Sequence, residues 1–305
     1  MERFIKLTKL IGIFTLSITL VGCASTKVIA PTDSFVRLYS DHELNVCASK
    51  KIKEDKGWQS SGMPECIQYN VRSSASGSII DHYKDPSTKE DKSLVLSVAH
   101  FCSLSEGQLI NMIPSEGLQQ MVQLGLYEIK SHKISQQSLT TIYSKNYRVI
   151  KNIASDAQVD VCLLESERLP VKRLPILKSN AEYGERILNM AAPWGYFNPP
   201  NIFIDEGLYL GECGNTNTCL NYGSFAISGV YAGQGSSGSP ILVRRAGRWY
   251  IAGIIHTVKI APFGGTYLPM GASVEQIQKV IQSNFIPYKN SRDIVISDPK
   301  EPSMK

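Results

Sequence analysis

The sequence predicts an all-β protein with one helix near its C-terminus, and two observations support this prediction. Short runs of β-branched and apolar residues recur along the chain, and Gly, Asn, Asp, Ser or Pro bound most of them, as is typical of strands. No long helical pattern separates these runs, which favours a barrel or a sandwich. The expected strands cover residues 76–81, 93–98, 161–165, 186–191, 202–210, 241–243 and 249–255.

The one clear helical pattern lies late in the chain. Ser273 stands where an N-cap is expected, and the apolar residues that follow recur at helical spacing: Val274, Ile277, Val280 and Ile281. We therefore expect a helix over residues 273–285, followed by a flexible polar tail over 287–305. A weaker break near residues 169–179 divides the strands into two groups.

Composition excludes several classes of protein. Of the 305 residues, 43% are hydrophobic and 19% are charged, which is an ordinary globular balance and excludes collagen-like repeats and long disorder. The net charge of +5, from 32 basic and 27 acidic residues, is too mild to indicate a nucleic-acid partner.

The N-terminus has the pattern of an export signal. Three basic residues precede an apolar run over residues 10–21, which is too short to span a bilayer comfortably. The run ends in Leu20-Val21-Gly22-Cys23, which resembles the lipobox of bacterial lipoproteins, where the Cys carries a diacylglycerol. An ordinary secretory signal with a chance Cys is the alternative.

The lipobox divides the chain into expected segments. Residues 1–22 are the signal peptide, 23–45 a tether, 46–286 the folded domain and 287–305 the tail. Ala24 after the lipidated Cys23 favours the outer membrane of a bacterial envelope, with the domain facing the periplasm or the exterior.

The cysteine count agrees with export. Seven Cys are present, and lipidation of Cys23 leaves six, an even number typical of an oxidising compartment. The expected disulfides are Cys213 with Cys219, Cys47 with Cys66, and Cys102 with Cys162. Two buried free thiols are an equal alternative for the last pair. No CxxC spacing occurs, so we expect no structural zinc, and no other cofactor is indicated.

A Gly-rich segment over residues 231–240 has the properties that a nucleophilic Ser requires. Its hydroxyl must be accessible, its backbone N–H must point at a developing oxyanion, and the backbone must approach the substrate closely. Gly235 and Gly238 meet these needs around Ser237, whereas their spacing suits Ser236 less well. A polar turn between two strands is the alternative.

Two further residues complete a possible triad. An apolar strand ends at His100, and a buried-looking strand over residues 158–164 carries one carboxylate, Asp160, near its start. A buried carboxylate is expensive unless a partner offsets it, and a His⁺ formed in catalysis is a natural partner. Asp156 lies in a polar loop and is a weaker candidate. The other polar-segment histidines are expected to be solvated bystanders: His42, His82 and His132.

These segments resemble the motifs of trypsin-like serine peptidases. Ser97-Val98-Ala99-His100 is similar to T-A-A-H, the segment over residues 160–164 to D-[IV]-A-L-L, and that over 235–240 to G-D-S-G-G-P. The order His, Asp, Ser is that of chymotrypsin. The resemblance covers about residues 73–285 and implies two six-stranded antiparallel barrels, over about 58–170 and 175–272, with the site between them.

The resemblance also implies roles. His100 is the general base and then the general acid, Asp160 orients it, and Ser237 is the nucleophile. The N–H groups of Gly235 and Ser237 form the oxyanion hole. Ser236 replaces the Asp that trypsin uses in activation, so no zymogen switch of that kind is expected.

Substrate-binding positions are expected at Tyr231, Gln234 and His256. Tyr231 stands where trypsin is acidic, which disfavours Lys or Arg at the cleavage site. His256 resembles the specificity His of glutamyl endopeptidases, displaced by one residue. It could read Glu or Gln if a bulge intervenes, support Asp160 if none does, or be a bystander.

The function expected is therefore a serine endopeptidase acting on protein or peptide substrates and held to a membrane by lipid. A catalytically silent binding lipoprotein of the same fold and an esterase using the same triad remain open. The sequence gives no oligomeric state.

Overall fold

The computed structural model describes residues 29–54, 62–193, 197–212, 224–260 and 267–284. Within the described ranges, no helix is both long enough and apolar enough to cross a bilayer.

Six antiparallel strands close the first barrel, in the order β1-β2-β3-β6-β5-β4. Its interior is filled by fully buried aliphatic side chains that include Leu38, Ile79, Leu96 and Leu163. The strands are β1 (Phe35–Ala48), β2 (Cys66–Lys84), β3 (Asp91–Ser97), β4 (Tyr127–Thr141), β5 (Asn146–Asp156) and β6 (Val161–Glu167).

The second barrel also has six antiparallel strands and closes in the order β10-β11-β12-β9-β8-β7. Gly253 and Gly271 let two neighbouring strands close over the Phe225 ring, because an added Cβ would lie 2.2 Å and 2.7 Å from it. The strands are β7 (Arg186–Ala191), β8 (Phe203–Glu212), β9 (Ser224–Ser228), β10 (Pro240–Arg245), β11 (Arg248–Ile260) and β12 (Tyr267–Ser273).

A C-terminal helix follows the second barrel, as expected. The helix α7 (Val274–Asn284) begins after Ser273, whose hydroxyl accepts from the Gln276 N–H while the Gln276 side chain accepts from the Ser273 N–H. This reciprocal pair is a capping box that satisfies two N–H groups otherwise left free at a helix start. The prediction of two six-stranded barrels with a C-terminal helix is confirmed.

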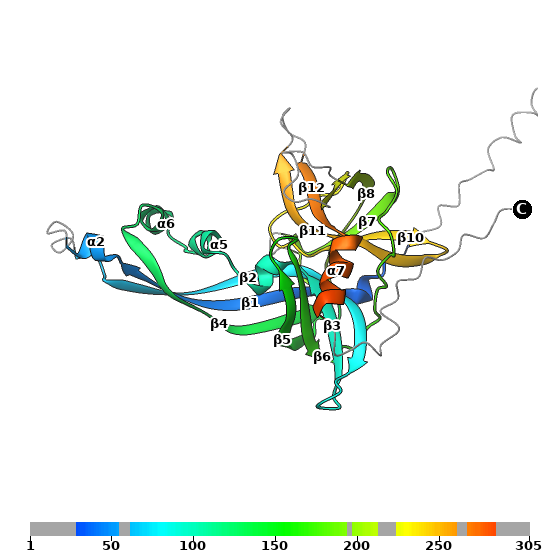
Figure 1. Cartoon of the computed structure of the whole chain (residues 1–305), viewed down its shortest axis with the longest axis horizontal. Helices are drawn as coiled ribbons and strands as arrows, with labels where there is room; N and C mark the ends of the chain where they lie inside the picture. The colour runs from blue at the N-terminus through cyan, green and yellow to red at the C-terminus, as the bar shows by residue number, and fades with distance from the viewer. Residues whose placement is uncertain (1–28, 55–61, 194–196, 213–223, 261–266, 285–305) are drawn as a thin grey trace, which may run out of the picture. The chain divides into compact units, whose positions relative to one another are not determined.

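Three strands of the first barrel continue beyond it as an arm (Figure 1). Residues 41–48 of β1 pair with 66–72 of β2 and 127–136 of β4, whereas β3 and β5 pair only with the barrel ends of their neighbours. Cys47 and Cys66 form an expected disulfide at the far end.

Two helices cover one face of the arm. They are α5 (Glu106–Asn111) and α6 (Glu116–Gln123), which follow one another between β3 and β4. Between these helices and the strands of the arm lies a small separate core, formed by Leu44, Val46, Ala48, Ile113, Leu118 and Tyr127. The described residues also include three short helical turns: Thr32–Ser34, α2 (Lys50–Lys53) and α4 (Ala99–Cys102).

The expected tether over residues 23–45 is wrong for residues 35–45, and the expected start of the first barrel near residue 58 is wrong as well. β1 begins at Phe35, and Val36 and Leu38 are fully buried. The segment reads as polar because β1 carries polar residues along its length, and three of them, Arg37, Ser40 and His42, are buried. Sequence analysis also missed α5 and α6, and the strands β1, β4, β5, β9 and β12.

The histidines expected to be solvated are not. His42 is 1% exposed, its Nδ1 lies 3.0 Å from His132 Nε2, and its Nε2 lies 2.9 Å from the Ser73 hydroxyl. His82 contacts Ser93 Oγ and the Val171 carbonyl, at 2.9 Å and 2.7 Å. Pairing across strands explains the error, because such contacts join residues far apart in the sequence.

Candidate active site

Ser237 lies in a tight loop between β9 and β10 that two glycines shape. Gly235 has a φ of +93° and Gly238 a φ of +84°, in the left-handed region that favours glycine. An added Cβ would lie 2.8 Å from the Ala192 carbonyl at Gly235 and 2.1 Å from the Ser76 carbonyl at Gly238. Both positions therefore require glycine for conformation and for space.

One serine of the first barrel holds this loop. The Ser76 N–H donates to the Ser237 carbonyl at 2.7 Å, and the Ser76 hydroxyl donates to the Gly235 carbonyl at 2.8 Å. The same hydroxyl accepts from the Ala192 N–H at 3.2 Å. Sequence analysis placed Ser76 in a strand but missed this role, because its partners lie more than a hundred residues away.

His100 and Asp160 lie side by side at the end of the first barrel where β3 ends and β6 begins. His100 lies in α4 directly after β3, and Asp160 lies in the turn before β6 with a φ of +55°. His100 Nδ1 is 2.8 Å from Asp160 Oδ2, and the His100 backbone N–H donates to Asp160 Oδ1 at 2.9 Å. The expected disulfide between Cys102 and Cys162 joins the same two segments.

The environment keeps Asp160 ionised. Burial acts to raise the pKa of its carboxyl, but hydrogen bonds from His100, the charge of His100 and that of His256 outweigh burial and lower the pKa. The competing Asp156 makes only local bonds, accepting from the N–H groups of Gln158 and Val159 at 2.9 Å and 3.4 Å. The geometry therefore favours Asp160 over Asp156 as the partner of His100.

His100 and Ser237 line one groove of about 710 Å³, together with Gly235. Among the described residues, no hydrogen bond joins His100 to the Ser237 hydroxyl. Catalytic hydrogen bonds are often long without substrate and tighten when it binds. The backbone N–H groups of Gly235 and Ser237 also lack a partner among the described residues, so they can donate to an oxyanion.

Solved structures with a similar architecture are proteases. The HtrA-type protease AlgW with a decapeptide matches with a TM-score of 0.52 at 14% identity, over 84% of this chain and 65% of that one. A variant of AlgW matches with a TM-score of 0.55 at 14% identity, over 83% and 64%. The active form of a protease from M. tuberculosis matches with a TM-score of 0.49 at 12% identity, over 83% and 82%.

The chain has the chymotrypsin-like fold. The two closed barrels and the match to AlgW decide this assignment. The chain spans about two thirds of the AlgW chains, 65% and 64% of their lengths. No family model and no curated protein matches the sequence.

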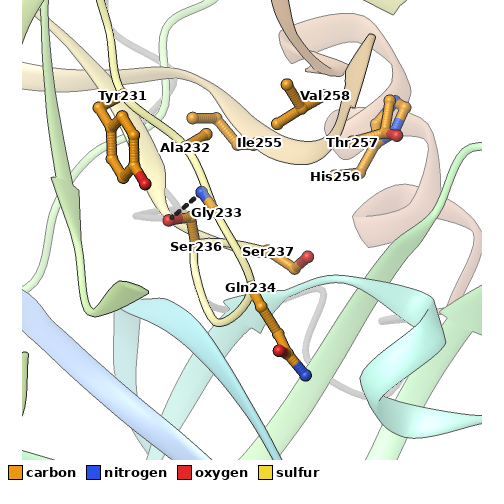
Figure 2. A pocket seen from close by; sticks show the side chains of 10 residues that line it. All are labelled: Tyr231, Ala232, Gly233, Gln234, Ser236, Ser237, Ile255, His256, Thr257 and Val258. Carbon is orange, nitrogen blue, oxygen red and sulfur yellow. Dashed lines mark hydrogen bonds between the residues drawn. The ribbon is translucent and has the colours of Figure 1, made fainter. Parts of the chain in front are cut away.

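In this chymotrypsin-like fold, a second pocket of about 540 Å³ also has Ser237 in its lining (Figure 2). The three expected substrate-binding residues, Tyr231, Gln234 and His256, all line it. Apart from His256, every lining residue is uncharged: Tyr231, Ala232, Gly233, Gln234, Ser236, Ser237, Ile255, Thr257 and Val258. Among the described residues of this wall, none offers a carboxylate to a Lys or Arg side chain.

His256 has features of both functional roles considered for it, binding a substrate side chain and supporting Asp160. The pairing of β11 with β12 shifts register between Ile255 and Thr257, which is the bulge that could restore a pocket position. His256 is 7% exposed, and its Nε2 is buried with no hydrogen-bond partner in the described structure. Burial lowers the pKa of His256, Asp160 acts to raise it, and His100 lowers it further. His256 thus lines the pocket and interacts electrostatically with Asp160.

Some expected positions lie outside the described residues. These are the lipidation residue Cys23 and the pair Cys213 and Cys219. The lipid anchor and the third disulfide stay predictions.

Proposed function

We propose that the chain is a serine endopeptidase that forms a covalent acyl-enzyme. The observation that carries this proposal is the arrangement around one groove. His100 is hydrogen-bonded to an ionised Asp160, Ser237 lines the same groove, and two N–H groups beside it are free to donate. The protease AlgW, whose structure contains a decapeptide, has the same fold.

The mechanism follows from these positions. Ser237 attacks the scissile carbonyl while His100 takes its proton, and the resulting imidazolium is stabilised by Asp160. The oxyanion accepts from the N–H groups of Gly235 and Ser237, and one such donor contributes about 2.7–4 kcal/mol to transition-state stabilisation. His100 then donates its proton to the leaving amine, and water hydrolyses the acyl-enzyme.

The pocket favours an uncharged side chain before the scissile bond. Burial lowers the pKa of His256, which disfavours the imidazolium form that would compensate a substrate carboxylate. The imidazole of His256, which lines the pocket, can exchange a hydrogen bond with an amide. We therefore propose apolar residues or Gln at this position, ahead of Glu, with Lys and Arg disfavoured.

We also propose that Cys23 carries the lipid that holds the enzyme to a bacterial membrane, in the outer membrane facing the periplasm or exterior. The proposal is supported by the basic, apolar and small residues that precede Cys23 in order. Metabolic labelling with a radioactive fatty acid tests it. Label in the wild type and none in Cys23→Ser is the expected result, and equal labelling of both overturns the anchor.

A fluorophosphonate probe tests the proposed endopeptidase. Mass spectrometry of the labelled, oxidised protein should locate the adduct on Ser237, and both Ser237→Ala and His100→Ala should abolish it. Hydrolysis of a peptide as well as an ester separates an endopeptidase from an esterase. A folded protein that is not labelled and cleaves no peptide would instead be a binding protein of this fold.

A further inference from the structure

The strand β2 has one open edge where it leaves the barrel. Residues 66–77 pair with β1 on one side, and β3 pairs with β2 only from Ser78 onward. Among the described residues, no other strand pairs with that edge. An edge strand presents a row of N–H and C=O groups that can template another strand.

The direction of these backbone groups follows from Ser76. Its N–H bonds the Ser237 carbonyl, so the backbone of residue 76 points away from β1 and toward the catalytic loop. In an antiparallel pair, alternate residues direct both their N–H and C=O to the same side. Ser74, Arg72 and Asn70 therefore present their backbone groups to the open edge.

The catalytic groove continues along this edge. The cavity that contains His100, Gly235 and Ser237 is also lined by residues 71–75 of β2 and by α5 with its flanking loops. The wall opposite β2 is largely apolar and includes Phe101, Leu104, Met112 and Pro114. On the β2 side, Val71 also lines the groove and is only half-buried, so it adds apolar surface there.

We propose that the arm binds the part of the substrate that follows the scissile bond, as an extended strand added to the open edge of β2. This inference rests on the proposed function and deepens it. The occupant is a peptide because the edge offers unpaired backbone groups and runs without a break into the groove at Ser237. From Ser74 to Gln68 the edge extends for about 20 Å at about 3.3 Å per residue, so about six substrate residues are accommodated.

The arm also sets a side-chain preference. Successive residues of an added strand point to opposite faces, so alternate substrate side chains meet the apolar wall that includes Leu104 and Met112. On the other face, Arg72 is already paired with Asp41 at 2.6 Å and 3.0 Å, which satisfies its charge. The preferred substrates therefore carry apolar residues at every second position after the scissile bond.

Substrate length provides the first test. All substrates in the series have the same residues before the scissile bond. Three fluorogenic peptides carry two, four or six residues after it, with apolar and polar residues alternating. An anilide with no residue after the scissile bond serves as the reference. We expect kcat/KM to rise about tenfold from two to six residues, the equivalent of about 1.4 kcal/mol. No rise in the wild type overturns the inference.

Two matched variants locate the effect. Asn70→Pro removes one N–H from the open edge, where Pro is tolerated, and Asn70→Ala is its control. Asn70→Pro should remove most of the gain with six residues, whereas Asn70→Ala should keep it, and both should cleave the anilide like the wild type. Met112→Ser, which keeps the backbone intact, should lower kcat/KM for apolar substrates but not for all-polar ones of equal length.

These outcomes separate the inference from the proposed function. Cleavage of the anilide with labelling of Ser237, but no dependence on length or on Asn70→Pro, overturns the docking of substrate on the arm alone. Failure of both labelling and cleavage overturns the endopeptidase itself. A length dependence that disappears as enzyme concentration rises shows that a second copy of the chain occupies the edge, which also contradicts the inference.

Discussion

The same three strands behave differently inside the barrel and in the arm. Within the barrel, β2 lies between β1 and β3, and residues 75–81 are buried. In the arm, β2 loses one neighbour, and its residues alternate between exposed and half-buried. The barrel thus holds the proposed catalytic residues in a fixed geometry, whereas the arm depends on a small core of its own and leaves an edge of β2 open.

The largest expected effect concerns Asp160, a proposed catalytic group of the first barrel. Asp160→Asn should lower kcat about 10⁴-fold, because an amide holds the imidazole in the wrong tautomer. Asp156→Asn, four residues away, is the matched control and should leave kcat within twofold of the wild type, roughly the scatter of a distant surface change. Steady-state kinetics on one peptide decides between them. A severe loss in Asp156→Asn would mean that the triad is assigned to the wrong carboxylate.

The second comparison concerns the junction between the catalytic loop and the first barrel. Gly238→Ala places a Cβ 2.1 Å from the Ser76 carbonyl and 2.4 Å from Ser97 Oγ, so backbone must move and we expect loss of labelling at Ser237. Gly247→Ala has a similar φ of +77° but open space, so it should cost only about 1–2 kcal/mol of left-handed strain and keep activity. Equal effects of the two substitutions would show that the junction tolerates displacement.

The third pair compares the two cores directly. Leu96→Ala in the barrel and Leu44→Ala in the arm each remove a fully buried side chain, at a typical cost of about 2–5 kcal/mol. We expect the barrel variant to lose anilide hydrolysis on mild heating. The arm variant should lose hydrogen-exchange protection in residues 41–48 and retain anilide hydrolysis. Loss of both properties together in Leu44→Ala would mean that arm and barrel unfold as one unit.

The smallest expected effect is the pH dependence of the arm at His42. Burial, and then the charge of His132, lower the pKa of His42, against an opposite effect of Asp41, and burial lowers the pKa of His132. The unfolded chain therefore binds more protons, and stability falls as pH drops below about 6.5, the unperturbed value. Urea midpoints at pH 7.5 and 5.5 should differ less for His42→Gln than for the wild type. If the urea midpoint changes with pH by the same amount in His42→Gln and in the wild type, other groups cause the acid sensitivity.

The proposed catalytic residues could be singled out in the sequence because local motifs carry them, and their catalytic role stays a prediction. His100, Asp160 and Ser237 each follow or precede an apolar strand, and the glycines around Ser237 have a direct steric reason. The arm could not be predicted in this way. Its strands are polar on one face, and its helices are short and carry few apolar residues, so their periodicity is weak. Long-range contacts such as those of Ser76 leave no local pattern.

The contacts of Ser76 have a consequence for biosynthesis. The catalytic loop takes its shape from hydrogen bonds to a strand made about 160 residues earlier, so neither half of the chain alone contains an assembled nucleophile. If the proposed function holds, a nascent chain therefore has no peptidase activity until both barrels have been translated and packed together. Residues 171–305, which include Ser237, should not react with a fluorophosphonate when they are produced alone. Reaction would show that the loop around Ser237 assembles without the contacts of Ser76.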